Sequence, residues 1–197
     1  MSVWRLLCFL SIILMSACSV LSPIPASEQN QYVLNAVPAV QSIPTPTPKT
    51  ILVMATETNP MFNTVDMVYT QRPYQLANFT HNRWAEVPAS MFHTALIQTL
   101  RNTHHFHAVV VPPYVGHYDY VLSTRLIELI TDFSSTPHVL RLRLHADLMA
   151  SPNNTLIFSK DFVIEQPIAA DTPYDSVTAA NHASANILKN LADLSML

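Results

Sequence analysis

The clearest pattern along the chain is a strict alternation of apolar and polar residues from 140 to 148. Leucine or alanine occupies each even position, whereas arginine, histidine or aspartate occupies each odd position. Successive side chains of a strand point to opposite faces of its sheet, so this period of two predicts a strand with one buried and one polar face. The polar turn residues at 151–154 and the extended stretch at 155–165 complete a predicted hairpin.

Two other segments follow the period of a helix. After Pro88, apolar residues recur at intervals of three and four until about residues 101–103, which predicts a helix with one apolar face. Proline suits the first turn, where a missing N–H does no harm. A second helix is predicted to start with Thr172 as N-cap, Pro173 at the first helical position and Asp175 near the positive end of the helix dipole.

Other extended segments, of which 118–133 is the longest, predict the remaining strands. They lie at residues 32–37, 51–54, 65–70, 74–79, 108–111 and 118–133. Strands and helices in this proportion favour an α/β fold, with two main helices packed on a mixed, mostly antiparallel sheet in two or three layers. The length fits one domain, which we place at residues 31–197.

The N-terminus shows a different pattern. Arg5 precedes an apolar run at residues 6–15. This run is too short to cross a bilayer, which requires about 20 apolar residues, but it has the length of the apolar region of a signal peptide. Residues 1–17 are therefore predicted to be a signal peptide.

The residues that follow the apolar run predict a lipid anchor. The stretch Met15-Ser16-Ala17-Cys18 resembles a lipobox, in which the cysteine thiol is acylated and becomes the new N-terminus. Residues 18–30 would then be a lipidated tether, and Ser19 favours the outer membrane because aspartate at that position favours retention in the inner membrane. The alternative is an ordinary signal peptide cut elsewhere, with Cys18 incidental.

Composition excludes several classes of function. The formal net charge is −3, with only 10 lysines and arginines, which does not resemble a nucleic-acid-binding protein. The single glycine, Gly116, cannot supply a P-loop, a dinucleotide-binding loop or a nucleophile elbow. Serine, histidine and aspartate are plentiful, so counting does not exclude a hydrolytic triad, but none lies in a recognisable activating context. We therefore expect a non-enzymatic protein without a cofactor.

Three clusters of residues could carry binding. His104, His105 and His107 invite a metal site, but neighbouring histidines on one loop seldom converge on one ion, and a polar turn is the favoured interpretation. Arg141 and Arg143 could hold an acidic partner or a phospholipid headgroup, although a solvated sheet face is more common.

Arg83 and Trp84 form the third cluster. The Trp84 ring is expected to pack under the helix that starts at Pro88. Contact with a partner is the alternative, because tryptophan is enriched at binding hot spots.

One stretch of the sequence resembles a known family, the ABC-type transport auxiliary lipoproteins of paraquat-inducible and MCE-type transport systems. It reads Tyr69-x-x-x-Pro73-x-x-Leu76-x-x-Phe79-x-x-x-Arg83-Trp84-x-x-x-Pro88. The order of the predicted elements extends the similarity over residues 31–194, including the closing helix with its Ala179, Ala180, Asn181 and Ala183. One departure is the loop at residues 59–64, which lacks an expected glycine.

The resemblance implies a non-enzymatic outer-membrane lipoprotein of an intermembrane lipid transport system. Its implied partners are an MCE protein that bridges the periplasm and the inner-membrane ABC transporter, and it could also associate with copies of itself. A structural or pilot lipoprotein for an outer-membrane secretion complex is the alternative function. The resemblance implies no catalytic residues, no metal and no cofactor.

Overall fold

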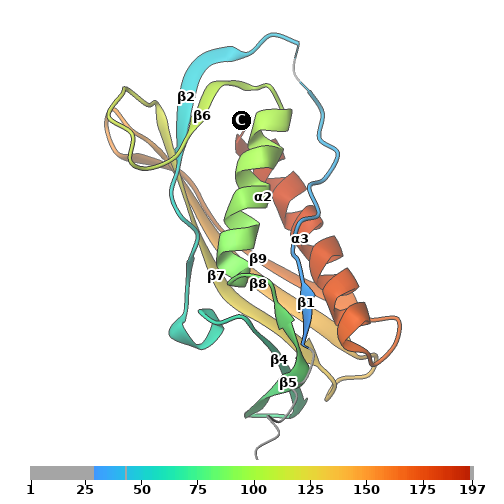
Figure 1. The fold of residues 1–197 in the computed structure, drawn as a ribbon. Coiled ribbons are helices and arrows are strands. Elements are labelled where there is room, and N and C mark those ends of the chain that lie inside the picture. Colours follow the sequence, from blue (N-terminus) through green and yellow to red (C-terminus); the bar gives the residue numbers. More distant parts are fainter. Residues whose placement is uncertain (1–28, 43, 196–197) are drawn as a thin grey trace, which may run out of the picture.

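The computed structural model describes residues 29–42 and 44–195. These residues form one α/β domain, in which two long helices cover one face of a nine-stranded mixed sheet (Figure 1). The predicted signal peptide, Cys18 and most of the predicted tether lie outside the described residues.

One side of the sheet is an antiparallel meander of three long strands. They are β7 (Tyr120–Asp132), β8 (Val139–Ala150) and β9 (Thr155–Pro167). In β8 the side chains of Leu140, Leu142 and Leu144 are buried, whereas Arg143 between them is exposed. The two faces predicted from the alternating sequence are therefore confirmed.

Shorter strands pair with the other edge of β7. In chain order they are β2 (Thr47–Val53), β3 (Glu57–Thr58) and β4 (Asp66–Arg72), all parallel to β7. Outside them lie β6 (Phe106–Val110) against β2, β5 (Gln75–Trp84) against β4, and β1 (Asn30–Tyr32) against β5. The parallel ladders are short and the long ladders are antiparallel, so the predicted mixed, mostly antiparallel sheet is confirmed.

The two helices lie side by side on the same face of the sheet (Figure 1). Helix α2 (Pro88–Asn102) packs on β6, and α3 (Pro173–Ser195) covers β8 and β9. The sequence predicted two or three layers, and the structure has two, the sheet and the pair of helices. The core between the layers is made mainly of leucine and alanine, which include Leu96, Leu122, Leu144, Ala180 and Leu191.

The starts of both helices follow from local sequence. The backbone N–H of Asp175 donates to the Thr172 hydroxyl oxygen at 3.1 Å, and α3 begins at Pro173, which confirms the predicted N-cap. Helix α2 begins at Pro88, as predicted, without a side-chain cap. Within the described ranges, neither helix combines the length and apolar character that crossing a bilayer would need.

Two of the predicted strands differ most from the structure. The first strand is not residues 32–37, because β1 ends at Tyr32 and the following residues leave the sheet. Strand β5 is longer than the predicted 74–79 and extends to Trp84, since β1 and β4 pair with it on both sides. The loop at residues 59–64 contains a short 3-10 helix, η2 (Pro60–Phe62), whose Phe62 packs with Val68 and Ile130 on the face without α-helices.

Candidate interaction surfaces

The segment that follows β1 is held against the helices by one side chain. We name residues 33–37 the N-terminal strap. The Asn181 amide of α3 accepts hydrogen bonds from the backbone N–H groups of Asn35 at 3.0 Å and Ala36 at 3.1 Å. It also donates to the carbonyl oxygens of Val33 and Val177, both at 3.0 Å. All four hydrogen bonds that this amide can make are thus formed within the fold.

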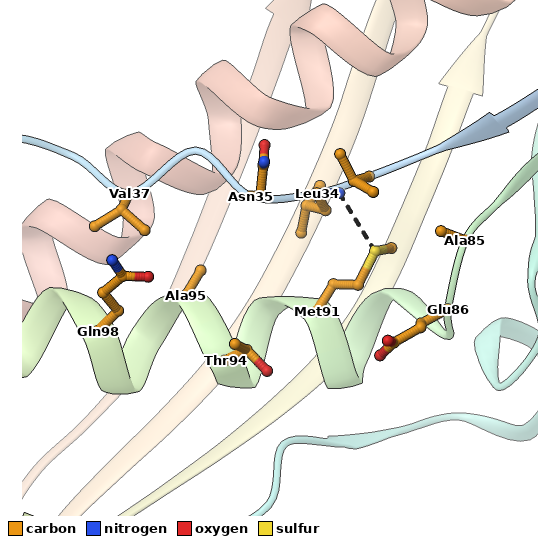
Figure 2. A pocket seen from close by; sticks show the side chains of 10 residues that line it. Leu34, Asn35, Val37, Ala85, Glu86, Met91, Thr94, Ala95 and Gln98 are labelled. Atoms are coloured by element: carbon orange, nitrogen blue, oxygen red, sulfur yellow. Dashed lines mark hydrogen bonds between the residues drawn. The ribbon is translucent and has the colours of Figure 1, made fainter.

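A groove lies between the N-terminal strap and α2 (Figure 2). Its volume is about 200 Å³, and its apolar lining includes Val33, Leu34, Val37, Met91 and Ala95. The backbone N–H of Leu34 donates to the Met91 sulfur at 3.3 Å, which ties the strap to the helix. Glu86 and Gln98 contribute the polar part of the lining. The chemistry of this groove suits the binding of a small apolar group.

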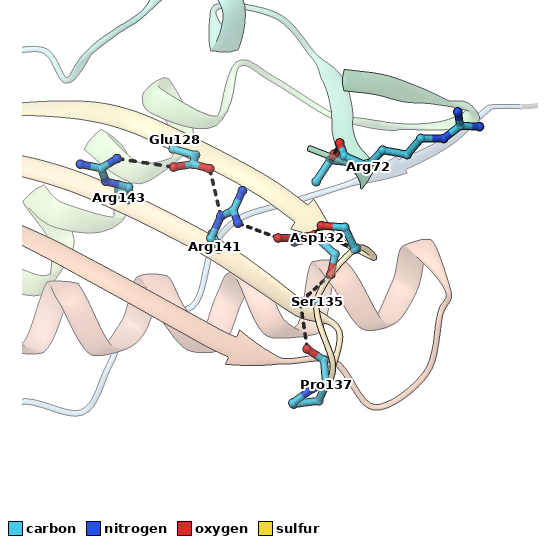
Figure 3. Close-up of polar contacts among 9 residues, drawn as sticks. Arg72, Glu128, Asp132, Ser135, Pro137, Arg141 and Arg143 are labelled. Atoms are coloured by element: carbon cyan, nitrogen blue, oxygen red, sulfur yellow. Dashed lines mark hydrogen bonds and ion pairs between the residues drawn. The ribbon is translucent and has the colours of Figure 1, made fainter. Parts of the chain in front are cut away.

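The face of the sheet away from the helices carries a network of charges (Figure 3). The Arg141 guanidinium lies 2.6 Å from the Asp132 carboxylate and 3.2 Å from Glu128. A bulge in β7 after Leu126 changes the register, so that Glu128 and Asp132 both point to the same face as Arg141. Arg143 is more distant, at 3.9 Å from Glu128, and its side chain is 47% exposed.

Asp132 shows how strongly this network is held. Burial of its carboxyl acts to raise the pKa, but hydrogen bonds from the Ser134 hydroxyl and backbone N–H and the charge of Arg141 outweigh it, so the pKa lies below the ordinary value of 3.8. Asp132 is therefore ionised at neutral pH and neutralises Arg141. Of the two arginines predicted as contacts, Arg143 presents the freer cation.

His145 joins two strands further along the same face. Its Nδ1 lies 2.7 Å from Asp161 of β9, and its Nε2 lies 3.2 Å from Asp147 of β8. The hydrogen bond with Asp161, helped by the charge of Asp147 and opposed by burial, raises the pKa of His145 above 6.5. Arg125 and Glu57 form a further exposed ion pair at 2.6 Å. These pairs link neighbouring strands of the sheet.

Arg83 and Trp84 are separated by the fold. The Trp84 side chain is 4% exposed and belongs to the core that α2 covers, so it is not available to a partner. Its backbone N–H donates to the carbonyl oxygen of Val65 at 2.7 Å. Arg83 is half-buried on β5, between Gln31 of β1 and Asp66 of β4. Of this predicted pair, only Arg83 remains a candidate contact.

The three clustered histidines have separate surroundings. His104 bonds through Nδ1 to the Ser42 hydroxyl at 3.0 Å, and the His105 ring stacks edge-on against Phe106. Burial lowers the pKa of His105. His107 is exposed on β6. Among residues 29–42 and 44–195, no group of three or more histidine, cysteine, aspartate or glutamate side chains is placed to share a metal ion.

A comparison of the sequence with known families now adds to this geometry. Residues 32–192 match the family described as ABC-type transport auxiliary lipoprotein component. The chain belongs to this family. The match begins at the end of β1 and extends into the last turns of α3, so it spans the whole domain. The family description places the chain among the auxiliary components of ABC-type transport. No curated protein matched the sequence.

Among the solved structures similar to this transport auxiliary lipoprotein, two that share its fold have TM-scores above 0.6. Protein XCC0632 from Xanthomonas campestris, of family DUF330, is 16% identical with a TM-score of 0.73, over 83% of this chain and 94% of that one. An uncharacterised protein is 14% identical with a TM-score of 0.62, over 84% and 97%. The PelC dodecamer from Paraburkholderia phytofirmans is more distant, at 12% identity and a TM-score of 0.44, over 77% and 92%.

Several of the residues that carried the family resemblance have packing roles in the lipoprotein. Tyr69 and Phe79 stack at 4.7 Å between ring centroids, and Phe133 packs edge-on against both. Ala179, Ala180 and Ala183 are buried where α3 approaches its neighbours. Sequence reasoning did not assign a role to Asn181. A polar amide beside buried alanines in a helix was its only local signal, because its partners lie 145–148 residues away.

Proposed function

We propose that this chain is a non-enzymatic adaptor, anchored by lipid on Cys18 at the periplasmic face of the outer membrane, in an ABC/MCE-type system that moves lipid between membranes. The match of the whole domain to the transport auxiliary lipoproteins carries the proposal. The apolar run at residues 6–15 and the lipobox-like Met15-Ser16-Ala17-Cys18 support the anchor.

The surfaces of the domain support binding more than chemistry. The titratable groups on the face without α-helices form ion pairs between neighbouring strands, in the way expected of a stable sheet. Charged residues make up 12% of the chain, about half of the ~25% that is usual in soluble domains. Large apolar side chains are exposed instead, and Val115, in the loop before β7, is 104% exposed. The low share of charged residues is compatible with a surface that is partly covered by partners.

Site-specific cross-linking in cells tests the proposal. A photoreactive amino acid at Val115 samples the loop before β7, and the same amino acid at Asn186 samples the exposed side of α3 as the control. We expect Val115 to yield an adduct with an MCE protein or an ABC-transporter subunit, and Asn186 to yield less of it. Adducts with secretion machinery and none with transport proteins would reject the adaptor in favour of a pilot lipoprotein.

A further inference from the structure

The direction of β1 shows from which end the preceding chain enters the domain. Strand β1 runs parallel to β5, with Asn30 beside Asn82 and Tyr32 beside Trp84. Strand β5 itself begins at the turn that joins it to β4. The start of β1 therefore points toward the β4–β5 turn, at the lower end of the molecule in Figure 1. The loop before β7 lies at the other end of the sheet.

The β4–β5 turn presents large apolar groups to solvent. Tyr74 is 108% exposed and Leu76 is 44% exposed, and Pro73 lies beside them. Met61 of η2, which is 58% exposed, lines the same hollow as these three residues. We call Met61, Pro73, Tyr74 and Leu76 the hairpin tip. The neighbouring Arg72 is exposed and adds a positive charge at its margin.

The conformation of Tyr74 is unfavourable for a tyrosine. Its φ is +66°, in the left-handed region. A two-residue turn with proline first and a left-handed residue second normally has glycine or asparagine at the second position, because a Cβ is strained there. A bulky residue in this conformation with its ring entirely in solvent stabilises neither the turn nor the core. Its presence is better explained by a contact outside the chain.

We propose that the hairpin tip rests in the headgroup region of the membrane that holds the lipid anchor. The proposal rests on the proposed acylation of Cys18. Tyrosine is enriched at membrane interfaces, where its ring meets apolar groups and its hydroxyl meets water. Leu76 and Met61 add apolar surface, and the long side chain of Arg72 can reach lipid phosphates.

The length of the tether allows this orientation. The 13 residues from Cys18 to Asn30 span at most roughly 40 Å. Asn30 lies beside Asn82, eight residues along β5 from Tyr74, which is a distance of about 26 Å. The tether is therefore long enough to bring the hairpin tip to the bilayer, and the start of β1 points toward that end.

Tryptophan fluorescence of the mature, acylated protein tests the contact. Trp84 is then the only native tryptophan, and it is 4% exposed, so its signal provides a constant background. Two variants add a probe, Tyr74→Trp at the hairpin tip and Val115→Trp at the other end as the matched control. Each is reconstituted into vesicles of phosphatidylethanolamine and phosphatidylglycerol that carry a spin label in the headgroup region.

We expect the probe at residue 74 to lose most of its emission to the spin label and to shift to shorter wavelength. The probe at residue 115 should emit as it does without the label. An acylated, vesicle-bound protein with equal emission from both probes would overturn this inference alone. Absence of acyl chains on Cys18, shown by mass spectrometry, would overturn the anchor and the inference together.

Discussion

At the scale of single residues, Asn181 connects α3 to the N-terminal strap. Its amide bonds to Val33, Asn35 and Ala36 of the N-terminal strap and to Val177 of its own helix. The strap has no partner strand, so these bonds satisfy backbone groups that a ladder would otherwise satisfy. An aliphatic residue at this position could fill the space but would leave three strap groups without a partner in the protein.

Asn181→Ala is expected to lower the free energy of unfolding by about 2 kcal/mol, because the bonds contribute roughly 0.5–1.5 kcal/mol each and water replaces part of them. Hydrogen exchange of the Asn35 and Ala36 amides should be faster in the variant than in the parent, whereas exchange of the core amides should change less. Asn190→Ala is the matched control, since Asn190 bonds only to Asn186 in the same helix. Equal unfolding free energies for the two variants would contradict the role of Asn181.

Tyr74 allows a test in which the free energy of unfolding should rise instead of fall. Tyr74→Gly should raise the free energy of unfolding by about 1 kcal/mol, because the left-handed conformation is strained for tyrosine and free of strain for glycine. Gln75→Gly, one residue later within β5, should lower it by roughly 0.5–1 kcal/mol, because glycine weakens a strand. Urea unfolding of both variants measures the pair. A loss of stability in Tyr74→Gly would show that the ring supports the turn.

At the scale of elements, His145 connects β8 to the edge strand β9. Its raised pKa means that the protonated ring is favoured in the folded state. This contribution to stability is fully present below the unfolded value of 6.5 and is lost as pH rises through the pKa of the folded protein. Burial lowers the pKa of His93 and of His105. Protonation of these two residues as the pH falls therefore reduces the free energy of unfolding.

A variant isolates the contribution of His145 from that of the other histidines. The unfolding free energy of the parent minus that of His145→Asn should be larger at about pH 5.5 than at about pH 8. His182→Asn, on the exposed side of α3, is the control variant and is measured in the same way. Urea titrations at both pH values provide the measurement. A difference that grows with rising pH would mean that Asp161 and Asp147 do not hold a protonated ring.

The same scale shows which elements could be predicted from sequence. Strand β8 and both helices could, because an alternating pattern, a proline at a helix start and the Thr172 cap act within a few residues. The N-terminal strap could not, since its residues have an extended local preference and their partner is in α3. The position of Trp84, four residues before Pro88, predicts that its ring packs under the helix, and its burial in the core that α2 covers confirms this.

At the scale of the whole molecule, exposed apolar side chains lie at two opposite ends of the domain. The hairpin tip lies at the end toward which the start of β1 points, and the exposed Val115 lies at the other. The proposed adaptor would direct one of these ends toward lipid and the other toward a partner. The helices and the long strands between the two ends keep them apart, because a 23-residue helix such as α3 is about 35 Å long.

The anchor itself gives the last prediction. Cys18→Ala removes the thiol that would be acylated, so the variant should keep its signal peptide or lack acyl chains, and it should not fractionate with the outer membrane, where the parent is expected. Ser19→Asp keeps the thiol but places an acidic residue after it, so this variant should be acylated and retained in the inner membrane. Ser19→Ala is the matched control and should behave like the parent. Membrane fractionation with mass spectrometry of the N-terminal peptide separates these outcomes. Normal maturation of Cys18→Ala would show that the cysteine is incidental, whereas an unchanged location of Ser19→Asp would remove only the argument for the outer membrane.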